Sequence, residues 1–461
     1  MIERTRGQSF SQAIAAFAAD FDPAALLPAH VRQCSRALID TMAVALAGRH
    51  QPAARRAAAY ACAAGSGAAL LWGTRSFVPV EAAALCNGVA AHVLDYDDVC
   101  SPMSGHPSVA LLPALVALAQ ARDLPGRRVA SAYVVGFEVA CHLGRALGTV
   151  HYERGWHTTA TVGTIATAAA CAHLVALDAA RTANAIGLAV AQTGGTREHF
   201  GTDAKSFQAG QCGAAAVRAV LLAETGFTAA AGALDGKAGL FALYGAERAE
   251  VIAAERAALG SWPLEIERSG IEIKKYPACY ATHRALDALL QLRAEHRFGI
   301  ADIARIDVVT SGSGLAPLRQ ELASTGTQGQ FSLPYVLAAA LLDGEIRLAS
   351  FTDSAVLRPE TQAFHAKVHA RESATPMLPR WAEIDVALID GRRLVRRITT
   401  LHGAPEDPLS DDELQHKAAD CLVWGDYSLD AATLAGAAFQ IGELPMRVVL
   451  DHMLAFTGSP T

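Results

Sequence analysis

Long apolar segments dominate the first half of the chain. From residue 9 to about 245, Ala- and Leu-rich segments alternate with short Gly, Pro or Asp punctuation, as in "RDLPGRR" and "ALDGKAG". Such segments predict helices, and apolar residues on most of their faces are typical of central helices in a large bundle. The uncharged run 158–177 carries five threonines and His173. We interpret it as a buried helix rather than a membrane span.

The pattern changes beyond residue 264. Residues 305–314, "RIDVVTSGSG", predict a strand that runs into a Gly/Ser turn, and two alternating runs joined at Asp390-Gly391 predict a hairpin. Helical segments are expected at 278–296 and 332–343. After residue 402 helices return, because Ser410 and Glu413 form a capping-box signature.

These patterns predict a mainly α fold with two parts. A large all-helical domain is expected from residues 1–264 and 403–461, and a smaller α+β lid domain from residues 265–402. The α+β unit is therefore an insertion between two helical parts of one domain.

Composition and charge limit the class of partner. Hydrophobic residues make up 52% of the 461 residues and aromatic residues 6%, which favours helices packed through small side chains. A net charge of −6 gives no electrostatic reason to expect nucleic acid or an anionic membrane. Nine cysteines without a CxxC pair, and an N-terminal stretch interrupted by charges, predict a reduced, cytoplasmic protein without a leader. We expect a small-molecule partner.

The stretch 92–107 concentrates the chemistry. Asp95, Asp97 and Asp98 stand within four residues, with His92 before them and His106-Pro107 after them. The acids can simply favour the start of the following helix, and carboxylates with histidine can also bind a divalent cation. A third interpretation places them in a catalytic site.

Two further stretches carry candidate binding groups. His157 precedes the buried helix of residues 158–177, where a capping or packing role is the common one. Arg197 and Lys205 lie in the glycine-bracketed stretch 193–220, with Lys205 at the entry of an Ala-rich helix, a place where an anion can bind. Lysine is a rare choice here, since only six occur among 39 cationic residues.

The stretch 271–292 adds a fourth group. A strand-like segment delivers Lys274, Pro277 is expected to start a helix, and Cys279 and His283 lie four residues apart on one face near its positive end. Such a place can lower the pKa of a thiol, although an inert Cys279 is the commoner outcome. Together the stretches supply cations and proton carriers for removing a proton next to a carboxylate. No nucleotide loop or serine-hydrolase elbow competes with this interpretation.

Four motifs in order resemble one family. "AAHVLDYDD…GHPS", "RGWHTTATVGTIATAAA", "FGTDAKSFQAG" and "KKYPACYATH" are similar to motifs of the MmgE/PrpD family, which includes 2-methylcitrate dehydratase, cis-aconitate decarboxylase and iminodisuccinate epimerase. The resemblance implies a helical domain with an α+β lid, a homodimer, and a cofactor-free enzyme, and we expect no metal ligands among the site residues. It implies a small di- or tricarboxylate as substrate.

The resemblance also assigns positions. Asp95, His106, Lys205 and Lys274 match family motifs, and Tyr335 in "FSLPYVLAA" matches a tyrosine of the family. We expect Asp95, His106, Lys274 and Tyr335 to be catalytic. The expected substrate-binding residues are Lys205, His157, Arg197, Cys279 and His283.

Two departures separate this chain from decarboxylase-like members. They carry threonine and histidine where this chain has Val99 and Cys279. We therefore predict a hydro-lyase of the 2-methylcitrate dehydratase type, in which Asp95 holds His106 and Lys274 or Tyr335 completes the acid and base. The alternatives are an epimerase of an amino- or imino-dicarboxylate, a decarboxylase, a carboxylate-binding protein without activity, and a metal-assisted enzyme built on the three acids.

Overall fold

A computed structural model describes residues 8–245 and 248–454. Helices make up most of the first part, where the only strands among the described residues, β1 (Ala69–Leu70) and β2 (Phe77–Val78), form a two-residue antiparallel ribbon. The prediction of a purely helical first part was therefore wrong at this ribbon. The helices are α1 (Phe10–Asp20), α2 (Pro28–Gly48), α3 (Pro52–Ala63), α4 (Val80–His92), α5 (Pro107–Ala121), α6 (Gly126–Leu147), α7 (Thr149–Glu153), α8 (Thr158–Leu174), α9 (Ala179–Val190), α10 (Asp203–Glu224), α11 (Leu240–Tyr244), α12 (Ala249–Ala258) and α13 (Glu265–Arg268).

Small residues allow the central helices of this part to pack closely. α10 packs against α4 and α8, and the crossing with α4 occurs where Gly88 faces Gly210. A Cβ added to Gly210 would lie 2.2 Å from the carbonyl oxygen of Leu85, so the backbones can approach this closely only with glycine. Every residue of α8 is buried, which confirms the buried helix predicted from the run 158–177.

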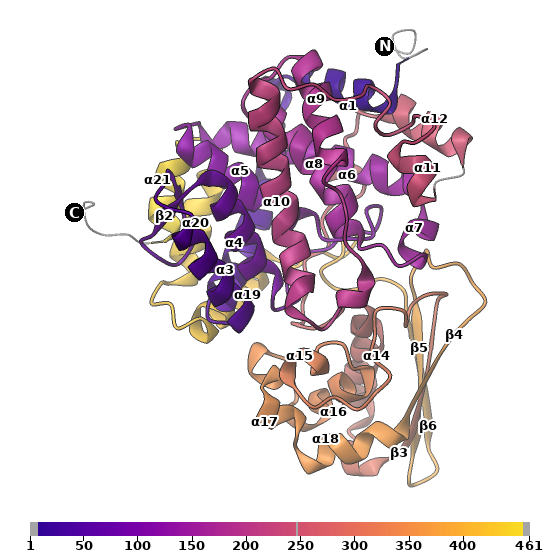
Figure 1. Ribbon diagram of the computed structural model, residues 1–461. Helices are drawn as coiled ribbons and strands as arrows, with labels where there is room; N and C mark the ends of the chain where they lie inside the picture. The colour runs from indigo at the N-terminus through magenta and orange to yellow at the C-terminus, as the bar shows by residue number, and fades with distance from the viewer. Residues whose placement is uncertain (1–7, 246–247, 455–461) are drawn as a thin grey trace.

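The α+β part follows. Its helices are α14 (Tyr280–His296), α15 (Gly326–Gly329), α16 (Leu333–Asp343), α17 (Asp353–Val356) and α18 (Pro359–Phe364), and its strands are β3 (Ile303–Thr310), β4 (Val368–Glu372), β5 (Ala382–Leu388) and β6 (Arg393–Ile398). The strand order is β4-β3-β5-β6, with β4 parallel to β3 and the other pairs antiparallel. In Figure 1 the helices of this part lie beside one face of the sheet.

Alternation of buried and half-buried positions explains how the sheet packs on its helices. Residues of β5 alternate between buried and half-buried positions, and the buried set, including Ile384 and Val386, packs in one core with Leu289 of α14. The predicted hairpin is confirmed, with Gly391 in the turn at φ +92°.

The chain then returns to the helical part. α19 (Asp411–Trp424), α20 (Ala431–Phe439) and α21 (Met446–Met453) complete the described residues, and α19 and α20 pack on α2. Ser410 and Glu413 form the predicted capping box. In Figure 1 these last helices, in yellow, lie with the indigo and purple helices of the N-terminal part. The two-part, mainly α architecture is thus confirmed, while the boundaries at residues 265 and 402 stay a prediction.

No helix among the described residues combines the length and the apolar character needed to cross a bilayer.

Candidate active site

A cavity lies where the helical part meets the α+β part. Its volume is about 110 Å³, several times the space that one water molecule needs. The helical part contributes one carboxylate, two imidazoles and one lysine, which are Asp95, His106, His157 and Lys205. The α+β part contributes Arg284, Ser311 and Arg380. The lining groups that can carry charge or donate hydrogen bonds are Asp95, Cys100, Ser104, His106, Tyr152, His157, Thr159, Lys205, Lys274, Cys279, Tyr280, Arg284, Thr310, Ser311, Ser313, Arg380 and Trp381.

Asp95 stands at a strained turn directly after α4. Its φ of +50° lies in the left-handed region, which aspartate tolerates better than most residues with a Cβ but which still costs free energy relative to extended or right-handed backbone. Lys205 Nζ lies 2.6 Å from Asp95 Oδ1 and Lys274 Nζ 3.2 Å from Oδ2. Burial alone would raise the pKa of Asp95, but the two lysine charges outweigh it and hold the pKa below its usual range.

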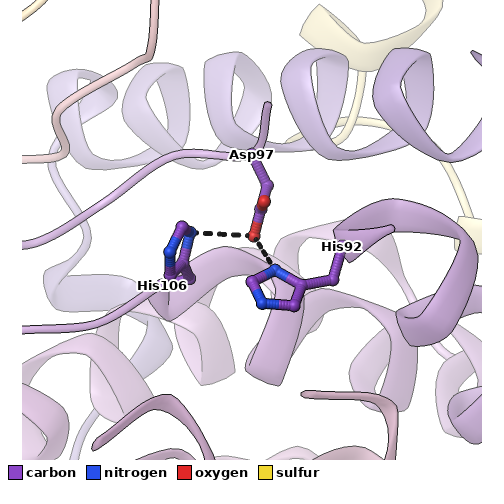
Figure 2. Close-up of side chains that lie close together, drawn as sticks. All are labelled: His92, Asp97 and His106. Carbon is purple, nitrogen blue, oxygen red and sulfur yellow. Dashed lines mark hydrogen bonds and ion pairs between the residues drawn. The ribbon is translucent and has the colours of Figure 1, made fainter. Parts of the chain in front are cut away.

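Asp97 lies between two imidazoles (Figure 2). Its Oδ2 accepts a hydrogen bond from Nδ1 of His92 at 2.8 Å and lies 3.1 Å from Nδ1 of His106. Burial would raise the pKa of Asp97, yet the two histidines hold it well below its usual range. With both Nδ1 atoms directed at one carboxylate, the Nε2 atoms point elsewhere. Nε2 of His92 lies 3.0 Å from Lys205 Nζ, and Nε2 of His106 lies 3.9 Å from Asp95.

This arrangement revises the role expected of Asp95. The carboxylate nearest to His106 is that of Asp97, while Asp95 is occupied by the two lysines. Asp98 has a third partner, because it accepts hydrogen bonds from the backbone N–H and the hydroxyl of Ser108 in the first turn of α5. Burial, with the charge of Asp40, raises the pKa of Asp98 well above its usual range. Capping is therefore correct for Asp98 and wrong for Asp97.

His157 lies at the start of α8, as expected for a cap position, and also lines the cavity. Its Nδ1 is 2.7 Å from Oε1 of Gln208. Because the ring is buried beside His92 and Lys205, its pKa lies well below the usual value, and the ring is neutral.

Cys279 reaches the cavity, but not as a thiolate. Helix α14 begins at Tyr280 rather than at Pro277, and Cys279 has a non-helical backbone with its N–H bonded to the carbonyl oxygen of Gln330. Burial, followed by the charge of Asp95, raises the pKa of the thiol to about 11. The alternative of an activated thiol was wrong because desolvation exceeds the effect of the helix end. The segment before it is not a strand either, since only Glu272 forms an isolated bridge, to Val99.

Three predicted residues lie outside the cavity lining. Tyr335 is buried in another core of the α+β part and donates its hydroxyl hydrogen to the carbonyl oxygen of Ser350. His283 lies behind the cavity wall, with Nε2 3.1 Å from the carbonyl oxygen of Ala278. Arg197 packs over the ring of Tyr152 at 4.3 Å, and Tyr152 lines the cavity.

The sequence analysis missed two cavity arginines, Arg284 and Arg380, and two cavity tyrosines, Tyr152 and Tyr280. Arg284 follows His283 directly, in a stretch that was already singled out. Arg380 stands before β5 and donates to the hydroxyl of Ser101 at 2.9 Å. Tyr280 donates to Glu272. Arginine is the common cation of this chain, so its presence at residue 380 gave no signal.

Among the described residues, one group with metal-ligand types lies beside the cavity, and of its members only His106 lines the cavity. His92, Asp97 and His106 offer ligand atoms that all lie within 4.8 Å of one another, and two imidazoles with one carboxylate suit a divalent transition metal. The ammonium of Lys205 at 3.0 Å from His92 opposes a second cation there. Asp95, Asp97 and Asp98 do not form a common metal site, because the one group of ligand types among the described residues includes only Asp97 of the three.

Comparison with known families decides the affiliation. The model of the MmgE/PrpD N-terminal domain matches residues 12–250, and that of the MmgE/PrpD C-terminal domain matches residues 276–426. The chain belongs to the MmgE/PrpD family. This confirms the resemblance carried by the four motifs.

Curated members of the family show a moderate similarity. Cis-aconitate decarboxylase of Homo sapiens is 28% identical over 415 residues, which cover 86% of this chain and 84% of that protein. The enzyme of the same name from Mus musculus is 28% identical over 84% of this chain and 81% of its own. A cis-aconitate decarboxylase-like protein, oryM, of Aspergillus oryzae is 29% identical over 85% and 86%.

Proposed function

We propose that this MmgE/PrpD protein is a cofactor-independent lyase that removes a proton next to a carboxylate of a small di- or tricarboxylate and expels water, as 2-methylcitrate dehydratase does. One observation carries the proposal. An imidazole with its Nδ1 against a buried carboxylate presents Nε2 at a cavity that four cationic side chains line. This is the arrangement that a general base needs beside an anionic substrate.

The cations divide into two groups. Lys205 and Lys274 lie beside Asp95, and Arg284 and Arg380 come from the α+β part. Cationic donors from both parts suit a substrate with carboxylates at both ends, since an arginine can bind a carboxylate through two hydrogen bonds. The lysines would stabilise the negative charge that develops on the carboxylate beside the reacting carbon.

The proposed reaction has two steps. His106 Nε2 takes the proton of the carbon next to the carboxylate, and Asp97 stabilises the imidazolium that forms. The electron pair of the broken C–H bond then forms the double bond as the hydroxyl group leaves the neighbouring carbon. Lys274 donates the proton that turns the hydroxyl into water. Tyr335 has no part in this scheme, because its hydroxyl is bonded elsewhere.

The names of the relatives favour decarboxylation as a second candidate. It uses the same charge-stabilising lysines, but needs a donor that protonates the carbon from which carbon dioxide has left. Cys279 occupies the position of the histidine in decarboxylase-like members, so the imidazole expected to handle that proton is replaced by a thiol. This residue supports dehydration over decarboxylation. Epimerisation shares the first step and returns the proton to the opposite face.

Proton NMR in deuterium oxide separates these outcomes. The protein is incubated with 2-methylcitrate, citrate, cis-aconitate and iminodisuccinate in turn. A new alkene signal without release of carbon dioxide supports the dehydratase, whereas carbon dioxide release supports the decarboxylase and deuterium incorporation with inversion supports the epimerase. Lys274→Ala should abolish any of these signals.

Lys275→Ala is the matched control, because Lys275 is adjacent but exposed, with its ammonium over the ring of Tyr276. It should behave as the unmodified protein does. Binding of these acids without turnover or exchange would contradict the proposal.

A further inference from the structure

The turn that carries Asp95 is bound by side chains along its backbone. Three consecutive carbonyl oxygens of segment 94–98 each accept a hydrogen bond from a long side chain. Gln330 Nε2 donates to Leu94 at 2.8 Å, Lys274 Nζ to Asp95 at 2.6 Å and Lys417 Nζ to Tyr96 at 2.8 Å. The three donors come from the α+β part, from the chain before α14 and from α19, so the turn is a meeting point of all three.

The buried lysines of the described chain share this target. Only Lys205, Lys274 and Lys417 are buried, and each contacts segment 94–98. Burying an ammonium is costly, and an apolar side chain of similar volume would serve helix packing at least as well. The convergence therefore indicates that the three ammonium groups are needed to hold segment 94–98 rather than to fill the hydrophobic core.

Lys417 differs from the other two because it does not line the cavity. Its ammonium lies 2.5 Å from Oδ1 of Asp40 on α2 and 4.0 Å from the centre of the Tyr96 ring. Asp40 thus fixes the ammonium, and the ammonium fixes the carbonyl next to the strained residue. The left-handed backbone of Asp95, at φ +50°, costs free energy even for aspartate, so a contact that fixes the neighbouring carbonyl favours it.

We propose that Lys417, held by Asp40, is a positioning residue that fixes the left-handed turn at Asp95 and thereby places the Asp95 carboxylate between Lys205 and Lys274. The effect on turnover rests on the proposed function, whereas the effect on the backbone does not. When the contact is lost, the turn relaxes and the carboxylate leaves the two lysines. Chemistry then slows, while the arginines that hold the substrate stay in place.

The test compares variants at one helix contact. Lys417→Met combined with Asp40→Asn removes the donor without leaving a buried charge unpaired. Lys417→Arg keeps a donor and should rescue the function. Arg36→Met is the matched control, since Arg36 bonds Leu409 and Asp411 at the same α2–α19 contact but does not touch segment 94–98.

The readouts are kcat, KM and hydrogen–deuterium exchange of backbone amides in residues 93–100. The double variant should lose at least tenfold in kcat with KM within threefold, and its 93–100 amides should exchange faster. Lys417→Arg should stay within threefold of the unmodified kcat. Arg36→Met should lose thermal stability but keep both kcat and the exchange pattern.

Two outcomes would overturn the positioning role. One is unchanged exchange in the double variant, and the other is faster exchange with an unchanged kcat, which would leave the proposed function intact. If the unmodified protein turns over no carboxylate, the proposed function fails alone, and the exchange comparison still decides whether Lys417 holds the turn.

Discussion

Replacing Asp97 by asparagine should remove most of the activity while leaving the fold intact. The amide side chain introduced there can accept one imidazole N–H through its oxygen, but its nitrogen can only donate. One of the two histidines that now direct Nδ1 at Asp97 must therefore change its tautomer or move. If His106 changes its tautomer, its Nε2 carries a hydrogen and can no longer act as a base.

The magnitude follows from the distance between the two groups. A carboxylate 3.1 Å from the imidazolium that forms at His106 stabilises it by about 5 kcal/mol at an effective dielectric constant of roughly 20. Since about 1.4 kcal/mol changes a rate tenfold, the loss in kcat should reach roughly 10³- to 10⁴-fold. This agrees with the usual contribution of a general base, about 10²- to 10⁴-fold.

Asp98→Asn is the matched control for this prediction. Asp98 is equally buried and adjacent, but its carboxyl bonds Ser108 and no imidazole. The assay follows appearance of the alkene, with circular dichroism as a check on folding. The reasoning is refuted if Asp97→Asn keeps kcat within threefold of the unmodified protein, or if Asp98→Asn loses as much activity.

Three further predictions concern other residues and conditions. Arg380→Gln should raise KM at least tenfold with a smaller change in kcat, whereas Arg392→Gln at the exposed hairpin should change neither; equal KM values in steady-state kinetics would contradict this. Burial lowers the pKa of His283 to about 3, below the value near 6.5 that the residue has in the unfolded chain. Because the unfolded chain therefore binds a proton more readily, the free energy of unfolding falls as pH decreases from 6.5 towards 3, by up to about 5 kcal/mol. Urea unfolding at several pH values should show that the free energy of unfolding of His283→Gln decreases less as pH falls. An equal decrease in the variant and the unmodified protein would contradict this prediction. Exhaustive chelation should leave activity unchanged; a loss restored by a divalent metal would favour a metal at His92, Asp97 and His106.

The sequence predicted the fold well where periodicity is strong. The run 158–177, the hairpin around Asp390-Gly391 and the Ser410 capping box each carry a local signal, and the structure confirms all three. The start of α14 was missed by three residues, because a proline marks an allowed first turn but cannot show that the chain bends without forming a helix as far as Cys279.

The candidate site was only partly predictable. Six predicted residues line one cavity: Asp95, His106, His157, Lys205, Lys274 and Cys279. They could be predicted because they lie in the recognised motifs and because lysine is scarce in this chain. Tyr335 was misplaced since a helical tyrosine after a strand carries no directional signal, and Arg380 was missed because its role depends on how two distant parts of the chain meet. The exchange of roles between Asp95 and Asp97 depends on side-chain geometry within four residues, which no spacing rule resolves.

Carbon–hydrogen exchange measured with and without His106 tests the central claim most directly. A carboxylate that the protein turns over is incubated in deuterium oxide, and deuterium at the carbon next to the carboxylate is followed by NMR for the unmodified protein and for His106→Gln. We predict that the unmodified protein cleaves or exchanges this bond and that His106→Gln does so at least about 10²-fold more slowly. Equal rates for the two proteins would show that His106 is not the base and would contradict the account.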